Sequence, residues 1–150
     1  MKLSTKILLG LLPVLLAAQL FQIDKNSPTY NLDNDMLAQV TAPAEVKDIL
    51  KQACYDCHSY ETKYPWYTNI APFSWWIDEH IQDGRRHLNF SEWGNYDLKK
   101  KKHKLEELIH EVEEGEMPLN SYTWAHSEAN LSKEQIEALI SWTKATMEGL

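Results

Sequence analysis

The two cysteines of the chain lie within the segment Cys54-Tyr55-Asp56-Cys57-His58. This segment has the pattern C-x-x-C-H, at which a c-type haem is attached. Two thiols one helical turn apart can each add to one vinyl group of the porphyrin, and the imidazole that follows can bind the iron as its proximal ligand. The spacing therefore predicts one covalently attached haem c, with Cys54 and Cys57 as thioether residues and His58 as an iron ligand.

Other uses of the same segment need other surroundings. A dithiol redox pair of the thioredoxin type belongs to a βαβ unit, which the sequence does not indicate. A zinc site needs four ligands, and the two cysteines with His58 and one distant histidine lack the usual spacing. A structural disulfide is compatible with an exported protein and stays open.

A second axial ligand is expected on an electron-transfer haem, because two strong ligands let the iron change oxidation state with little rearrangement. Methionine sulfur is a soft ligand that raises the potential. Met117 is the best candidate, since Gly115 and Pro118 place it in an irregular segment after a helix. The alternative is a loop methionine that fills a gap in the core. His126 is the strongest rival ligand, because it lies in an aromatic loop.

Aromatic side chains follow the motif and could cover a haem. Residues 60–73 contain two prolines. They are expected to form an aromatic loop that leads into the next helix, with Tyr64, Trp66, Tyr67, Phe73, Trp75 and Trp76. Such rings pack well against a flat apolar porphyrin, and they can equally build the core of a small domain. Arg85 and Arg86 are candidates to pair with the haem propionates, or to form a solvated surface pair.

Residues 1–24 differ from the rest of the chain. Lys2 and Lys6 precede an apolar run of about 15 residues, from Ile7 to Phe21. This is the layout of an export signal, and the run is shorter than the roughly 20 residues that span a bilayer comfortably. A cleaved signal peptide and an uncleaved membrane anchor both fit, and the lack of a clean A-x-A site favours the anchor. A buried core helix would leave the lysines without a role.

The remaining chain is expected to form one domain. The protein has 150 residues and a formal charge of −7, which fits one globular core and speaks against a general nucleic-acid binder. Two cysteines cannot make a disulfide scaffold. Residues 25–40 are polar and read as a linker, so the haem-binding domain is predicted over 41–150.

Hydrophobic periodicity indicates helices and no convincing strand. Thr41 is expected to cap the helix that carries Val46, Ile49 and Leu50, with the cysteines continuing its end. Three more helices are predicted: 74–83, ended by Gly84; 97–114, followed by Gly115; and one that begins at Ser132 with a Ser132–Gln135 capping box. The predicted fold class is all-α, a small c-type cytochrome-like helical domain with long aromatic loops around one haem.

Several segments, in order over residues 41–145, resemble the bacterial haem-binding domain family of small c-type cytochrome-like proteins. They are Val46 through Ser59 with its C-x-x-C-H, Tyr64-Pro65-Trp66-Tyr67, Ile70-Ala71-Pro72, Gly84-Arg85-Arg86, Leu88-Asn89-Phe90-Ser91-Glu92-Trp93 and Gly115-Glu116-Met117-Pro118. The resemblance implies an exported or membrane-anchored monohaem protein. It implies Cys54 and Cys57 as thioether residues and His58 as the proximal ligand, and it gives some support to Met117.

We therefore expect a carrier of single electrons outside the cytoplasm, periplasmic or held at the cytoplasmic membrane by residues 1–24. The haem iron would be bound by His58 and Met117. Its partner would be another redox protein, with no nucleic acid involved, and no acid–base or nucleophile constellation predicts an enzyme. The alternative is a haem with an open sixth position that binds a small gas or reduces peroxide.

Overall fold

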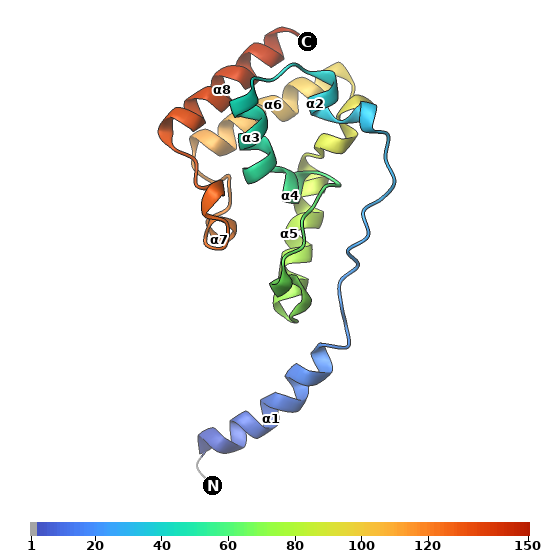
Figure 1. Ribbon diagram of the computed structural model, residues 1–150, viewed down its shortest axis with the longest axis vertical. Helices are drawn as coiled ribbons and strands as arrows, with labels where there is room; N and C mark the ends of the chain where they lie inside the picture. The colour runs from blue at the N-terminus through green and yellow to red at the C-terminus, as the bar shows by residue number, and fades with distance from the viewer. Residues whose placement is uncertain (1–2) are drawn as a thin grey trace.

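The computed structural model describes residues 3–150, and all regular structure within them is helical (Figure 1). The elements are α1 (Leu3–Ala18), η1 (Leu32–Asn34), α2 (Met36–Gln39), α3 (Ala44–Ala53), α4 (Tyr55–His58), η2 (Trp66–Asn69), α5 (Phe73–His87), η3 (Phe90–Asn95), α6 (Leu98–Glu113), α7 (Asn120–Thr123), η4 (Ser127–Ala129) and α8 (Lys133–Glu148). The predicted all-α class is confirmed.

Helix α1 projects from one end of the domain, and an extended segment runs from it toward α2 (Figure 1). Its described leucine, isoleucine and valine side chains are exposed. Within residues 3–150, no helix combines the length and the hydrophobicity that crossing a bilayer requires.

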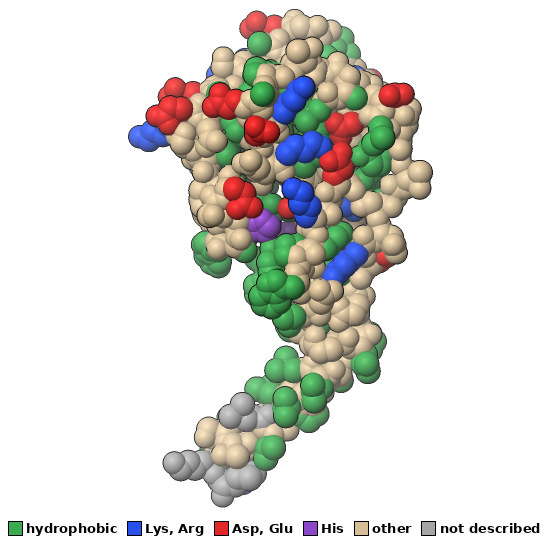
Figure 2. All heavy atoms as spheres, viewed as in Figure 1, with side chains coloured by type: hydrophobic (Ala, Val, Ile, Leu, Met, Phe, Trp, Pro, Cys, Tyr) green, Lys and Arg blue, Asp and Glu red, His purple; other side chains and the backbone are tan. Residues whose placement is uncertain are grey.

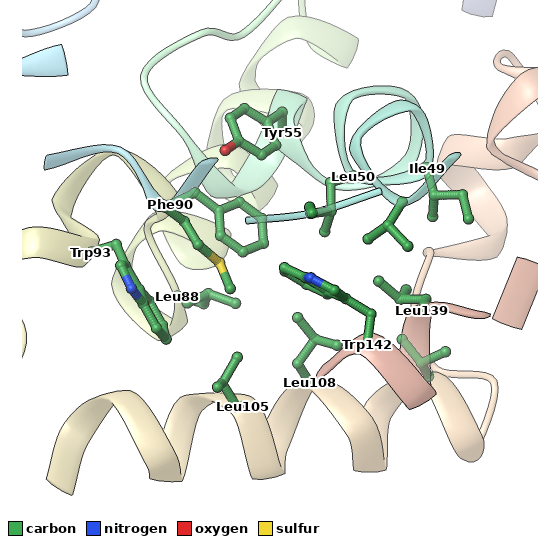
Figure 3. Close-up of a cluster of buried hydrophobic side chains, with 14 residues drawn as sticks. Ile49, Leu50, Tyr55, Leu88, Phe90, Trp93, Leu105, Leu108, Leu139 and Trp142 are labelled. Carbon is green, nitrogen blue, oxygen red and sulfur yellow. The ribbon is translucent and has the colours of Figure 1, made fainter. Parts of the chain in front are cut away.

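The core lies where α3, α6 and α8 meet (Figure 3). Leu50, Leu105 and Leu139 contribute one fully buried side chain from each of these helices. Removing such a side chain from water stabilises the fold by about 1.5–3 kcal/mol. Trp142 closes the cluster, and its indole N–H donates to the Thr41 carbonyl over 3.0 Å.

The predicted bounds of α6 and the predicted start of α8 are confirmed. Asp97 caps α6 by accepting from the Lys100 amide, and Ser132 and Gln135 form the capping box of α8. Helix α3 begins later than expected, at Ala44, with Pro43 at the capping position. The prediction that Thr41 caps this helix is therefore wrong.

The core also includes part of the segment that the sequence assigns to the linker. Met36 is completely buried, and buried Asp35 accepts a hydrogen bond of 2.8 Å from the Tyr55 hydroxyl. Although residues 25–40 are mostly polar, part of this segment belongs to the folded domain, because η1 and α2 pack against η3. Composition did not reveal this packing, since the short helix α2 buries only one large apolar side chain.

Helix α5 does not end at Gly84, as predicted, but continues to His87. Gly84 is buried, and a Cβ atom built there would lie 2.7 Å from the Cys57 carbonyl oxygen and 3.1 Å from its carbon. The glycine therefore serves helix packing rather than helix termination. It lets α5 approach the backbone of α4 more closely than any side chain would allow.

Replacing Gly84 by Ala is expected to lower the free energy of unfolding by about 1–2 kcal/mol. Alanine favours a helix by about 1 kcal/mol. Overpacking costs about 1–3 kcal/mol, and a clash with backbone, which cannot move aside as a flexible side chain can, belongs to the upper part of that range, about 2–3 kcal/mol. Urea unfolding followed by circular dichroism measures the difference. Gly10→Ala is the matched control, because Gly10 is also helical and nothing lies within 4 Å of the position that its Cβ atom would take. Equal stability of Gly84→Ala and the wild type would contradict the packing argument.

Candidate functional site

The C-x-x-C-H segment forms its own helical turn. Cys54 ends α3, and its φ of −126° breaks the helix before α4 begins. The amides of Cys57 and His58 then both donate to the Cys54 carbonyl, over 3.2 and 2.9 Å. The cysteines therefore lie one turn apart, on a separate short helix rather than on the continued end of α3.

The two residues between the cysteines hold α4 in place. Tyr55 is buried, stacks on Phe90 with ring centroids 4.9 Å apart, and donates its hydroxyl to Asp35. Asp56 is also buried, and its carboxylate accepts from the Lys63 amide over 3.0 Å and from the Tyr122 hydroxyl over 2.7 Å. One face of α4 is thus tied to the core, and the other to the aromatic loop and α7.

The His58 imidazole is held in a defined orientation. Its Nδ1 lies 3.0 Å from the Leu88 carbonyl oxygen, and Phe90 meets its ring edge-on. A carbonyl can only accept, so Nδ1 is the protonated nitrogen and Nε2 keeps its lone pair. Burial lowers the pKa of His58, although the backbone hydrogen bonds oppose this shift. A neutral imidazole oriented through its second nitrogen is the form that binds a metal ion.

Both cysteines are free thiols in this structure. Burial is the main reason that the pKa rises to about 12 for Cys54 and to about 11 for Cys57. A dithiol redox site needs the opposite shift, since only the thiolate attacks a disulfide. The thiol environment therefore disfavours the thioredoxin-type alternative.

A cavity lies beside α4 and is lined by residues of α4, η2, α5 and α7. Figure 1 shows where α4, α5 and α7 lie. The empty volume of the cavity is about 630 Å³, part of it open to solvent. Its lining is largely aromatic and aliphatic, and includes Cys57, Phe73, Trp76, Ile81, Leu119 and Ala125.

A chain of polar contacts crosses one end of the cavity. The Tyr67 hydroxyl and His126 Nε2 are hydrogen-bonded at 2.5 Å. Tyr122 stacks on the His126 ring at 4.1 Å and donates its hydroxyl to Asp56. These contacts connect η2, α4, α7 and the segment after α7, all of which contribute residues to the cavity lining.

The structure brings only some of the predicted site residues together. Cys57 lines the cavity, and His58 follows it on the same turn. Cys54 and Met117 are partly buried and pack against the hydrophobic core. His126, the rival ligand, lines the cavity with its Nε2 engaged by Tyr67.

The arginines that were candidates for haem propionates have protein partners. Arg85 donates from Nε to the Ser59 carbonyl over 2.8 Å and from its terminal nitrogen to Thr62 over 2.9 Å. Arg86 forms an ion pair with Asp83. Arg85 therefore supports the loop that leaves α4.

Comparison with known families gives one finding. A family model described as a haem-binding domain matches residues 13–145. No curated protein and no solved structure matches the chain.

The residues present fit a haem. Within the described residues, no group of three or more histidine, cysteine or acidic side chains could hold a bare metal ion. A porphyrin supplies four nitrogens of its own, so the protein needs to supply only axial ligands. His58 offers the oriented imidazole with a free Nε2 lone pair. Cys57 and the aromatic walls border the cavity, whereas His58 follows Cys57 on the same turn and is not among the residues that line the cavity.

Replacing Tyr122 by Phe is expected to lower the free energy of unfolding by about 1–3 kcal/mol, because it leaves the buried Asp56 oxygen without its hydroxyl donor. Urea unfolding of the two proteins measures this loss. Tyr64→Phe is the control, since the Tyr64 hydroxyl forms no hydrogen bond within residues 3–150. A loss no larger than that of Tyr64→Phe would show that the Tyr122–Asp56 contact does not hold the cavity together.

Proposed function

Since this chain belongs to the haem-binding domain family, we propose that it is a monohaem c-type cytochrome-like protein that transfers single electrons outside the cytoplasm. The observation that carries the proposal is the arrangement of α4. Two thiols lie one turn apart, Cys57 borders an aromatic cavity, and the neighbouring His58 is oriented by the Leu88 carbonyl.

Each of these residues has a specific role in the proposal. Cys54 and Cys57 bind the porphyrin through thioethers, and the proximal iron ligand is His58, with Met117 as the second axial ligand. The bound haem supplies the one-electron chemistry of iron. The chain sets the reduction potential of the haem, and its aromatic cavity walls keep water away from the haem.

Residues 1–24 support the location that we propose. A positive start followed by an apolar helix is the layout of an export signal or anchor, and haem c attachment follows export. The domain would then lie on the outer side of the cytoplasmic membrane and exchange electrons with another redox protein. We propose a carrier rather than an enzyme.

The position of Met117 favours a second candidate function. This side chain packs against the core, whereas Leu119, two residues later, lines the cavity. A haem whose sixth position is open would bind a small gas or react with peroxide. The two candidates differ in the coordination of the iron, which spectra report.

The first test uses the protein matured in a host that attaches haem c. We expect the pigment to stay with the polypeptide in acid acetone, because thioether bonds are covalent. We also expect the reduced spectrum to be that of a six-coordinate low-spin haem and to be unchanged by carbon monoxide. A colourless protein or complete extraction of the pigment would contradict the proposal, and rapid carbon monoxide binding would support the second candidate.

The second test replaces Met117 by Ala. We expect a lower reduction potential and new binding of carbon monoxide, since loss of the sulfur ligand opens the iron. Met147→Ala is the matched control, because Met147 is also partly buried against the core. An unchanged potential and spectrum in Met117→Ala would show that Met117 is not the ligand.

A further inference from the structure

One apolar surface is not explained by a haem. Trp66, Ile70 and Trp75, from η2 to the start of α5, expose 74%, 46% and 42% of their surface. None of the three lines the cavity, whereas their neighbours Phe73 and Trp76 do. We call these three residues the aromatic edge. A haem in the cavity would leave the aromatic edge uncovered.

The aromatic edge is joined to the C-terminal end of α1. The Gln19 side-chain amide donates to the Ala71 carbonyl over 2.9 Å and accepts from the Ala71 amide over 3.0 Å. The Trp75 indole N–H donates to the Phe21 carbonyl over 2.7 Å. Hydrophobic side chains accordingly gather at the end of the domain nearest α1 (Figure 2). These contacts place the aromatic edge next to the C-terminal end of α1.

The segments that meet at the aromatic edge contain no acidic residues. The chain has 22 acidic residues, yet residues 3–23 and 62–77 contain none, and their charged residues are Lys6 and Lys63. The two acid-free segments are the ones that Gln19 and Ala71 bring together. A surface with this charge is compatible with anionic lipid headgroups.

The exposed side chains of α1 favour lipid over a protein partner. Leu11 and Leu12, and then Val14, Leu15 and Leu16, are all exposed, and consecutive residues point to different sides of a helix. A groove on one protein would cover one side only, whereas a helix that is apolar all round suits an apolar medium. Tryptophan is enriched where such a medium meets water.

We propose that the aromatic edge lies in the headgroup region of a lipid bilayer, beside the point where α1 enters the bilayer. This inference rests on the membrane association of residues 1–24 in the proposed function. The domain then has two membrane contacts, which fix its orientation. Phe73 and Trp76 place the haem cavity next to the membrane surface.

The test uses the full chain on vesicles of phosphatidylcholine and phosphatidylglycerol. Its tryptophan fluorescence is compared on ordinary vesicles and on vesicles whose acyl chains carry bromine near the headgroups. We expect bromine to quench the wild type. We expect Trp66→Phe to lose about half of the bromine-dependent quenching, because Trp75 remains in the aromatic edge, and Trp66→Phe combined with Trp75→Phe to lose most of it. Any quenching by haem is the same on both vesicles. Trp124→Phe is the matched control, since Trp124 is 85% exposed and lies outside the aromatic edge.

Three outcomes would overturn the proposal: bromine-dependent quenching that Trp66→Phe leaves unchanged, equal loss in Trp124→Phe, or failure of the chain to bind vesicles. Association of two copies that Trp66→Phe abolishes would assign the aromatic edge to a dimer and would also overturn it. Failure to bind vesicles removes the membrane part of the proposed function as well. Failure of haem attachment is seen separately as a colourless protein, because the quenching measurement does not need haem.

Discussion

The contact between Gly84 and the Cys57 carbonyl is the constraint on which the candidate site depends. A helix of four residues, such as α4, has too few internal hydrogen bonds to hold itself in place. The elements that pack against α4 hold it in place. Helix α5 lies so close to it that a Cβ atom at Gly84 would clash with the Cys57 carbonyl. The same helix α5 supplies one wall of the cavity. The position of the thiols relative to that wall is therefore set by backbone rather than by flexible side chains.

Tyr55 and Asp56 occupy the two positions of C-x-x-C-H that haem attachment leaves unspecified, yet both are buried. Tyr55 links α4 to α2 and η3, and Asp56 links it to the aromatic loop and to Tyr122, 66 residues later. His58 points toward Leu88 from the same turn. Tyr55 and Asp56 thus position the neighbouring cysteines and His58, which are the residues proposed to bind the haem.

The features that could be predicted from the sequence are those that depend on residues close together in the chain. Helix periodicity identified α6, periodicity with the capping box at Ser132 identified α8, and C-x-x-C-H identified the turn with the thiols. The role of Gly84 was missed because a glycine near a helix end reads as a terminator, and only the partner helix reveals a close approach. The pairing of Tyr122 with Asp56 and that of Tyr67 with His126 could not be predicted, since nothing local to either residue indicates its partner.

The two walls of the cavity come from distant parts of the chain, and α7 is a short helix with no buried residue of its own. The contacts that hold it against α4 are few, with Tyr122 the main one. A cofactor that touched both walls would add to these contacts. By thermodynamic linkage, its binding would stabilise the position of α7 against α4.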